Sequence, residues 1–173
     1  MQRFLKLGIL LCIISCAPIH VVYDYDKQTN FSNYKTYNYY ANLETGLSEL
    51  DTNRLLDILD EQLQNKGLLL SETPDFFIDI TSAEFEAVNR NTVGVGVGGG
   101  GRNIGGGVSI GIPIAQNGIN RQIVFDFRDE NVVGLFWQAV IESSFNQKNT
   151  PEKREAKLQT IVTKVLKGFP PKK

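Results

Sequence analysis

The sequence predicts an α+β domain, in which a mostly antiparallel β-sheet packs two helices on one face. The predicted order is ββα-β-β-ββ-α, with a glycine-rich hairpin or loop. Three observations support this fold class. Short segments that alternate polar and apolar residues are typical of strands, and two longer segments repeat apolar residues at helical spacing. One helical segment follows the first two strands and the other ends the chain, and strands grouped between two helices favour an α+β sandwich.

The first two predicted strands, residues 21–26 and 34–40, contain every tyrosine of the chain. Aromatic side chains in neighbouring strands commonly pair across a half-buried sheet, which is the interpretation that we favour. The alternative is an aromatic platform for a glycan or peptidoglycan, formed by the cluster from Tyr23 to Tyr40. That alternative requires at least two of its contact residues, Tyr25, Tyr37 and Tyr39, to be exposed and coplanar.

The two helical segments carry recognisable start signals. Ser48 and Asp51 have the spacing of a capping box, in which Ser48 caps the helix and Asp51 reaches back. Gly67 suits the end of this helix. Its polar side chains, including Asp57, Asp60 and Glu61, are expected to form a solvated face. The apolar stripe of the first helix consists of Leu55, Leu59 and Leu63, with Leu56 beside it.

The last helix is predicted to begin after Thr150, with Pro151 at its first position, where proline is favoured. Its buried stripe consists of Leu158, Ile161 or Val162, Val165 and Phe169.

Between the helices, one strand changes the parity of its apolar residues. Phe76, Ile78 and Ile80 share one face, whereas Ala83, Phe85 and Ala87 share the other. A strand with one buried face cannot bury both sets, so we expect a bulge near residues 81–82, or a strand that leaves the sheet there. Residues 121–128 and 133–137 are predicted to form an antiparallel hairpin, with Trp137 in the core.

Residues 94–111 form a glycine-rich insertion that holds ten of the sixteen glycines. No Gly-Lys-Ser/Thr follows, so a phosphate-binding loop is not expected. We predict a projecting hairpin with a flexible tip, and the alternative is a disordered low-complexity loop. Because a glycine face lets another backbone approach closely, the tip is a candidate partner contact. The contact residues proposed for it are Gly98, Gly99, Gly100, Gly101 and Arg102.

The N-terminus resembles a bacterial lipoprotein signal peptide. Arg3 and Lys6 precede an apolar stretch over residues 7–14, which is shorter than the roughly 20 residues of a membrane span. Residues 13–16 resemble a lipobox that ends in Cys16. The sequence therefore predicts a signal peptide over residues 1–15, a lipidated tether over 16–21 and a single domain over 22–171. The expected location is the cell envelope, lipid-anchored at the outer membrane and facing the periplasm.

Composition argues against several functions. The chain has 18 Lys and Arg against 19 Asp and Glu, and removal of Arg3 and Lys6 leaves 16 against 19, a net charge near −3. No nucleic-acid partner is expected, because such proteins usually carry a basic patch. The single histidine, His20, rules against a catalytic triad or a multi-histidine metal site. We therefore expect no metal, no small-molecule cofactor and no enzyme. A carboxylate hydrolase is the alternative, with candidates Asp24, Asp26, Asp79, Glu84, Glu86 and Asp126.

Several segments together resemble the DUF4136 family of bacterial lipoproteins. These segments are residues 21–26 (VVYDYD), 30–37 (NFSNYKTY), 65–68 (NKGL) before 74–76 (PDF), 124–126 (VFD) with Trp137, and 165–171 (VLKGFPP). Members of the family often carry Trp-Arg-Gly, where this chain has Trp137-Gln138-Ala139. The resemblance implies an envelope location and an α+β fold, and it supplies no catalytic residue. The predicted function is a non-enzymatic, membrane-anchored assembly or interaction module whose partners are the membrane and another envelope protein.

Overall fold

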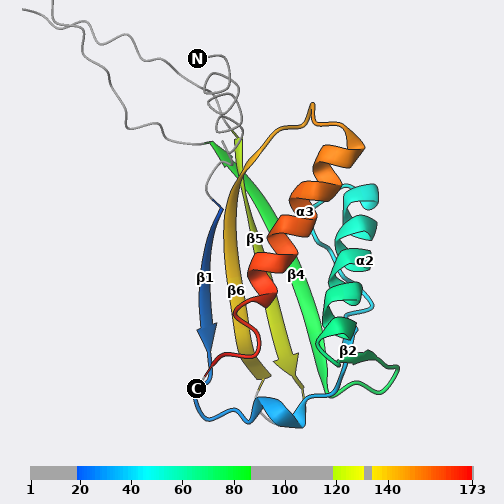
Figure 1. Ribbon diagram of the computed structural model, residues 1–173, viewed down its shortest axis with the longest axis vertical. Helices are drawn as coiled ribbons and strands as arrows, with labels where there is room; N and C mark the ends of the chain where they lie inside the picture. Colours follow the sequence, from blue (N-terminus) through cyan, green and yellow to red (C-terminus); the bar gives the residue numbers. More distant parts are fainter. Residues whose placement is uncertain (1–18, 87–118, 131–133, 173) are drawn as a thin grey trace, which may run out of the picture.

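The computed structural model describes residues 19–86, 119–130 and 134–172, which form two layers (Figure 1). One layer is a six-stranded sheet, and two α-helices cover one face of it, which confirms the predicted fold class. The elements in chain order are β1 (His20–Tyr25), the 3-10 helix η2 (Phe31–Asn33), β2 (Thr36–Tyr39), α2 (Glu49–Asn65), β3 (Leu69–Leu70), β4 (Phe76–Glu86), β5 (Ile119–Asp129), β6 (Gly134–Phe145) and α3 (Pro151–Leu166).

The strands lie in the order β1-β6-β5-β4-β2-β3. Pairing is antiparallel from β1 through β6 and β5 to β4, while β2 pairs in parallel with both β4 and β3. β1 and the two-residue β3 are therefore the edges of the sheet. The short β3 was not predicted, because two residues carry no measurable periodicity.

Both helices begin where the sequence predicts. The Ser48 hydroxyl accepts the Asp51 N–H at 3.3 Å, and the Thr150 hydroxyl accepts the Lys153 N–H at 3.5 Å. The prediction that the Asp51 side chain reaches back to complete the capping box is wrong. The carboxylate binds two arginines instead. α2 and α3 run side by side in the same direction (Figure 1).

The core lies between the helices and the sheet. Trp137 packs at its centre, with ring centroids 4.6 Å from Phe127 and 5.2 Å from Phe169. The predicted leucine stripe of α2 and the predicted stripe of α3 are buried, as is Trp137. Burying each such side chain contributes about 1.5–3 kcal/mol. The largest fully buried side chains are Trp137, Tyr37, Phe76, Phe125, Phe127, Phe136, Leu55, Leu59, Leu63, Ile78, Ile80 and Ile123.

The predicted bulge at residues 81–82 is wrong. β4 stays in continuous register with β5 from Phe77 to Glu86. The parity change is possible because none of residues 81–85 has its side chain in the core, and Phe85 is 38% exposed. A register shift occurs instead in the pairing of β5 with β6, between Phe127 and Arg128. It gives β6 one extra residue, so that the consecutive Phe136 and Trp137 are both buried.

Candidate functional site

One end of the domain, called the upper end from its place in Figure 1, gathers several chain segments. β1 begins there, and the register pairs His20 with Glu142 near the end of β6. β4 ends and β5 begins there, because Glu86 pairs with Ile119. Both helices also begin there (Figure 1). The start of β1, the end of β4 and the start of β5 therefore all lie at the upper end.

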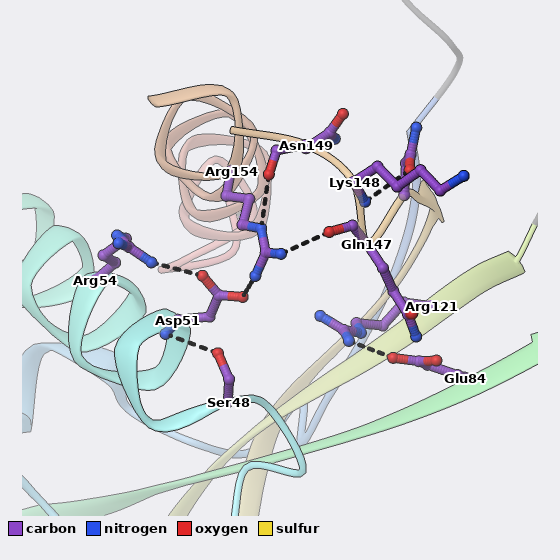
Figure 2. A network of polar contacts seen from close by, with 10 residues as sticks. Ser48, Asp51, Arg54, Glu84, Arg121, Gln147, Lys148, Asn149 and Arg154 are labelled. Atoms are coloured by element: carbon purple, nitrogen blue, oxygen red, sulfur yellow. Dashed lines mark hydrogen bonds and ion pairs between the residues drawn. The ribbon is translucent and has the colours of Figure 1, made fainter. Parts of the chain in front are cut away.

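A buried carboxylate joins the two helices at the upper end (Figure 2). Asp51 of α2 is 4% exposed. Its Oδ1 accepts from Arg54 at 2.8 Å, and its Oδ2 accepts from Arg154 of α3 at 3.0 Å. Arg154 also donates to the carbonyl oxygens of Gln147 at 2.7 Å and Asn149 at 3.2 Å. Charge-assisted hydrogen bonds of this kind are about twice as strong as neutral ones. Asp51 thus fixes the start of α3 and the loop before it.

Next to this ion pair lies a small recess of about 30 Å³ between the sheet and α3. Its polar lining includes Arg121 of β5 together with Arg154 and Lys157 of α3. Lys157 donates to the Ser144 hydroxyl at 3.1 Å. The apolar part of the lining consists of Ile123, Phe145, Leu158 and Ile161.

Arg121 is held in a fixed position beside the recess. Its guanidinium carbon lies 3.5 Å from the centroid of the Phe145 ring, a cation–π contact. It also forms an ion pair with Glu84 (Figure 2). Within residues 19–86, 119–130 and 134–172, its buried Nε finds no acceptor. The side chain is 11% exposed, so this orphan donor is largely shielded from water.

The helix starts add to the positive potential of the recess. A helix carries about half a positive charge at its N-terminus, from backbone N–H groups without helical partners. α2 and α3 both present that end at the upper end of the domain (Figure 1). Cations, helix starts and an apolar floor make this recess suited to binding an anionic group.

The alternative interpretation, a platform of exposed and coplanar tyrosines, does not fit the structure. Tyr37 is fully buried and Tyr39 is half-buried, while Tyr25 is 38% exposed. The rings of Tyr37 and Tyr39 are not coplanar, since their planes meet at 85°. Aromatic pairing across strands is found instead, for example between Tyr37 of β2 and Phe76 of β4, whose ring centroids are 6.2 Å apart.

Asp60 is the half-buried partner of two of these tyrosines. Its Oδ1 accepts the Tyr37 hydroxyl at 2.7 Å and the Tyr39 hydroxyl at 2.6 Å. Burial, followed by the hydrogen bond to Asp60, raises the pKa of both phenols. Asp57 and Glu61 of the predicted solvated face are exposed, whereas Asp60 lies at its border and binds the two phenols.

Four of the six candidate hydrolase carboxylates, Asp24, Asp26, Glu84 and Asp126, accept hydrogen bonds from neighbouring groups. Asp126 accepts from Gln138 and from Arg128, each at 2.7 Å. Asp24 accepts the Tyr25 N–H, and Asp26 accepts the Gln28 N–H, each at 2.9 Å. Glu84 pairs with Arg121, and Asp79 lies opposite Asp126 in the register of β4 and β5.

The sequence of this chain matches one known protein family. A family model described as a domain of unknown function, DUF4136, matches residues 21–171. This chain belongs to the DUF4136 family.

Several solved structures are similar to this DUF4136 domain at low sequence identity. A PDZ domain protein from Parabacteroides distasonis has a TM-score of 0.58 and 14% identity over 99% of this chain, which spans 41% of that protein. The PelC dodecamer from Paraburkholderia phytofirmans has a TM-score of 0.51 and 9% identity, over 90% of this chain and 100% of that one. A DUF4136 family protein from Bacteroides thetaiotaomicron has a TM-score of 0.48 and 14% identity, over 88% and 96% of the two chains. No curated protein matches the sequence.

Some predicted site residues of the DUF4136 domain lie outside the described residues. These are Cys16 and the glycine-tip residues 98–102. Conversely, sequence reasoning missed the recess. The spacing of Arg154 and Lys157 on one turn of α3 was a usable signal, but their meeting with Arg121 depends on the fold.

No group of three or more His, Cys, Asp or Glu side chains in residues 19–86, 119–130 and 134–172 is arranged to hold a metal ion. No helix in those ranges has the length and apolar character needed to cross a membrane.

Proposed function

We propose that this DUF4136 domain is a cell-envelope lipoprotein that acts as a non-enzymatic assembly or interaction module. In this proposal acyl chains on Cys16 anchor it to the outer membrane, with the domain in the periplasm. Its partners are the membrane and another envelope protein.

The observation that carries the proposal is the position of the chain entry. β1 begins at His20, which pairs with Glu142 near the upper end of β6. The four residues from Cys16 to His20 span at most about 14 Å. An acylated Cys16 would therefore hold the upper end close to the membrane surface.

The described site supports binding rather than catalysis. The upper end offers cations, helix starts and an apolar floor, and its one buried carboxylate, Asp51, is engaged by two arginines. The PelC structure of similar fold is a dodecamer, so this fold occurs in at least one assembly. The segment 87–118, with the proposed contact residues at its glycine tip, joins the domain at the same end.

The test compares two cysteine variants in cells that receive a clickable palmitate analogue. We expect Cys16→Ala to abolish acyl labelling and Cys12→Ala to keep it, because Cys12 lies in the predicted signal peptide. Cross-linking followed by quantitative mass spectrometry should then recover an envelope protein with the wild type and with Cys12→Ala. Loss of that partner in Cys16→Ala is the expected result. Labelling that persists in Cys16→Ala, or no enriched envelope protein in the wild type, would contradict the proposal.

A further inference from the structure

We propose that the edge strand β1 binds an extended segment of a partner protein as an additional antiparallel strand of the sheet. The segment carries a lysine or arginine opposite Asp24 and apolar residues opposite Val22 and Tyr23. The inference rests on the proposed function in calling the partner an envelope protein and in excluding a second copy of this chain. The binding edge itself is argued from the described residues.

The main chain of β1 has hydrogen-bonding groups that the neighbouring β6 does not use. The N–H of Asp26, the residue after β1, donates to a carbonyl of β6 at 3.0 Å, and the register of the two strands has no shift. In an antiparallel pair, successive residues direct these groups toward the partner strand and away from it in turn. The even-numbered residues of β1 therefore bond to β6, whereas Val21 and Tyr23 direct their N–H and C=O groups away from the sheet.

The groups on either side of this pair are already engaged. The Ile19 carbonyl accepts from Lys164 at 3.1 Å, and the Tyr25 N–H donates to the Asp24 carboxylate at 2.9 Å. Between them, no other strand of the described residues pairs with β1, which is the end of the sheet. An extended segment laid along residues 21–23 could thus form two hydrogen bonds with each of the two outward-facing residues.

Two apolar side chains are exposed at this edge. Val22 is 68% exposed, and Tyr23 is 38% exposed on the opposite face, where its hydroxyl donates to the Lys164 carbonyl of α3. Edge strands of soluble proteins are usually protected by charges, by bulges or by a covering element. The regular β1, with a valine exposed at its centre, lacks these protections within the described ranges. An added strand would cover both side chains.

The charges beside the edge favour a basic segment. Asp24 shares a face with Val22, because alternate residues of a strand point the same way. Asp24 is exposed, and no ion pair among the described residues includes it. Glu142 of β6 lies on the same face and accepts from the neutral Gln122 at 3.1 Å. A lysine or arginine opposite Asp24 would pair with a carboxylate across the two strands.

A second copy of this chain fits the edge less well. Antiparallel pairing of one β1 with another would place His20 opposite Asp24, but it would point the two upper ends in opposite directions. Acyl chains at the two upper ends would then face away from each other and could not share one membrane surface. The partner is therefore a different protein.

The test uses the full-length chain with Cys16→Ala, so that acylation plays no part, and the peptide acetyl-TKVVIET-amide. Bound antiparallel with its lysine opposite Asp24, this peptide places valines opposite Tyr23 and Val22. Amide hydrogen exchange followed by NMR reports the new hydrogen bonds directly. We expect the amides of Val21 and Tyr23 to exchange rapidly in the free protein and about tenfold more slowly with the peptide bound. The Val22 amide, which bonds to β6, is the internal control.

Matched changes in the peptide and in the protein keep the test specific. The peptide N-methylated at its third and fifth residues keeps every side chain but loses the two N–H groups that face β1, and we expect it to bind about tenfold more weakly. Val21→Pro removes an outward N–H at a position where a sheet edge tolerates proline, and it should weaken binding of the unmodified peptide to a similar extent. Leu70→Pro makes the same change on the other edge strand and should leave binding intact. The Leu70 N–H also points outward, because Leu69 and Ser71 donate to residues 35 and 37.

The charge preference has its own test. Asp24→Asn keeps an oxygen for the Tyr25 N–H and removes the charge, so we expect it to weaken binding of the lysine peptide about threefold. A peptide with glutamate in place of the lysine should bind the wild-type edge more weakly and recover with Asp24→Asn. Equal affinity of the two peptides for the wild-type edge would contradict the basic partner.

Three further outcomes would overturn the inference. Equal binding of the N-methylated and unmodified peptides would show that no strand is added. Unchanged binding with Val21→Pro would place the peptide away from β1. Protection of the Val21 and Tyr23 amides when the protein alone is concentrated would assign the edge to a second copy of the chain. None of these results depends on acylation, so they are separable from a failure of the Cys16 experiment.

Discussion

At the scale of a single residue, Asp51 makes one contact that sequence spacing predicts and another that only the tertiary structure determines. Its distance from Ser48 along the chain predicts a capping role, and the backbone half of that role is present. Its carboxylate nevertheless binds Arg154, which lies 103 residues further on. The sequence pattern identifies the cap, in which the Ser48 hydroxyl accepts the Asp51 N–H. The partner of the Asp51 carboxylate depends instead on which helices and strands pack together in the fold.

We predict that Asp51→Asn lowers the free energy of unfolding by about 2 kcal/mol, because it leaves Arg154 without its charged partner in a largely buried position. The estimate stays below the range for fully buried pairs, since the side chains of Arg54 and Arg154 are 25% and 29% exposed. Urea denaturation followed by circular dichroism measures the change. Asp57→Asn, on the exposed side of the same helix, is the control and should cost less than about 0.5 kcal/mol. Equal losses in the two variants would show that the ion pair contributes nothing specific.

At the scale of elements, the sequence predicts what short-range periodicity determines. The starts of α2 and α3, their buried stripes and the β5–β6 hairpin follow from spacing and cap residues, and the structure confirms them. The bulge was misplaced, because a change of parity has two solutions. A strand can kink, or it can extend beyond the residues that bury one of its faces, and β4 takes the second. Periodicity within one strand does not reveal how far the opposing layer reaches.

The candidate site was less predictable than the fold for a related reason. The recess combines side chains from α2, β5, β6 and α3, and its members are far apart in sequence. The amphipathic pattern of α2 predicts a solvated position for Asp60, yet the hydroxyls of two tyrosines of β2 donate hydrogen bonds to it. Polar residues at the border of a helical stripe can be placed only after the neighbouring layer is known.

The junction between α3 and the edge strand β1 provides a test of packing between elements. A Cβ built on Gly168 would lie within 2.7 Å of the Tyr23 Cζ atom, and the Tyr23 hydroxyl donates to the Lys164 carbonyl. We expect Gly168→Ala to destabilise the protein by about 1–3 kcal/mol through overpacking. In a Tyr23→Ala background the same change should cost less than about 1 kcal/mol, because the ring it meets is absent. Thermal and urea unfolding of the four proteins measure the coupling, and additive losses would contradict a steric cause.

At the scale of the whole molecule, the two ends of the domain differ in the features that they carry. The chain entry, the two connections to residues 87–118, both helix starts and the recess lie at the upper end, while the C-terminal residues lie at the opposite end (Figure 1). This arrangement follows from the parallel direction of α2 and α3 together with the antiparallel pairing of β1, β6, β5 and β4. A lipid on Cys16 would place the upper end at the membrane. The recess and the connections to residues 87–118 would then share one membrane-facing surface.

We therefore predict a fixed orientation of the acylated protein on a membrane. Under the proposed processing Cys12 is removed and Cys16 is acylated, so an introduced cysteine is the only free thiol. A fluorophore on Lys148→Cys, at the upper end, should transfer energy efficiently to acceptor-labelled lipids in reconstituted vesicles. The same fluorophore on Lys172→Cys, at the opposite end, should transfer far less, because the twelve residues of β6 span about 40 Å between the two ends. The additional change Cys16→Ala should release both labelled proteins from the vesicles. Equal transfer from the two labels would mean that the tether does not orient the domain, and stronger transfer from Lys172→Cys would place the recess on the side that faces away from the membrane.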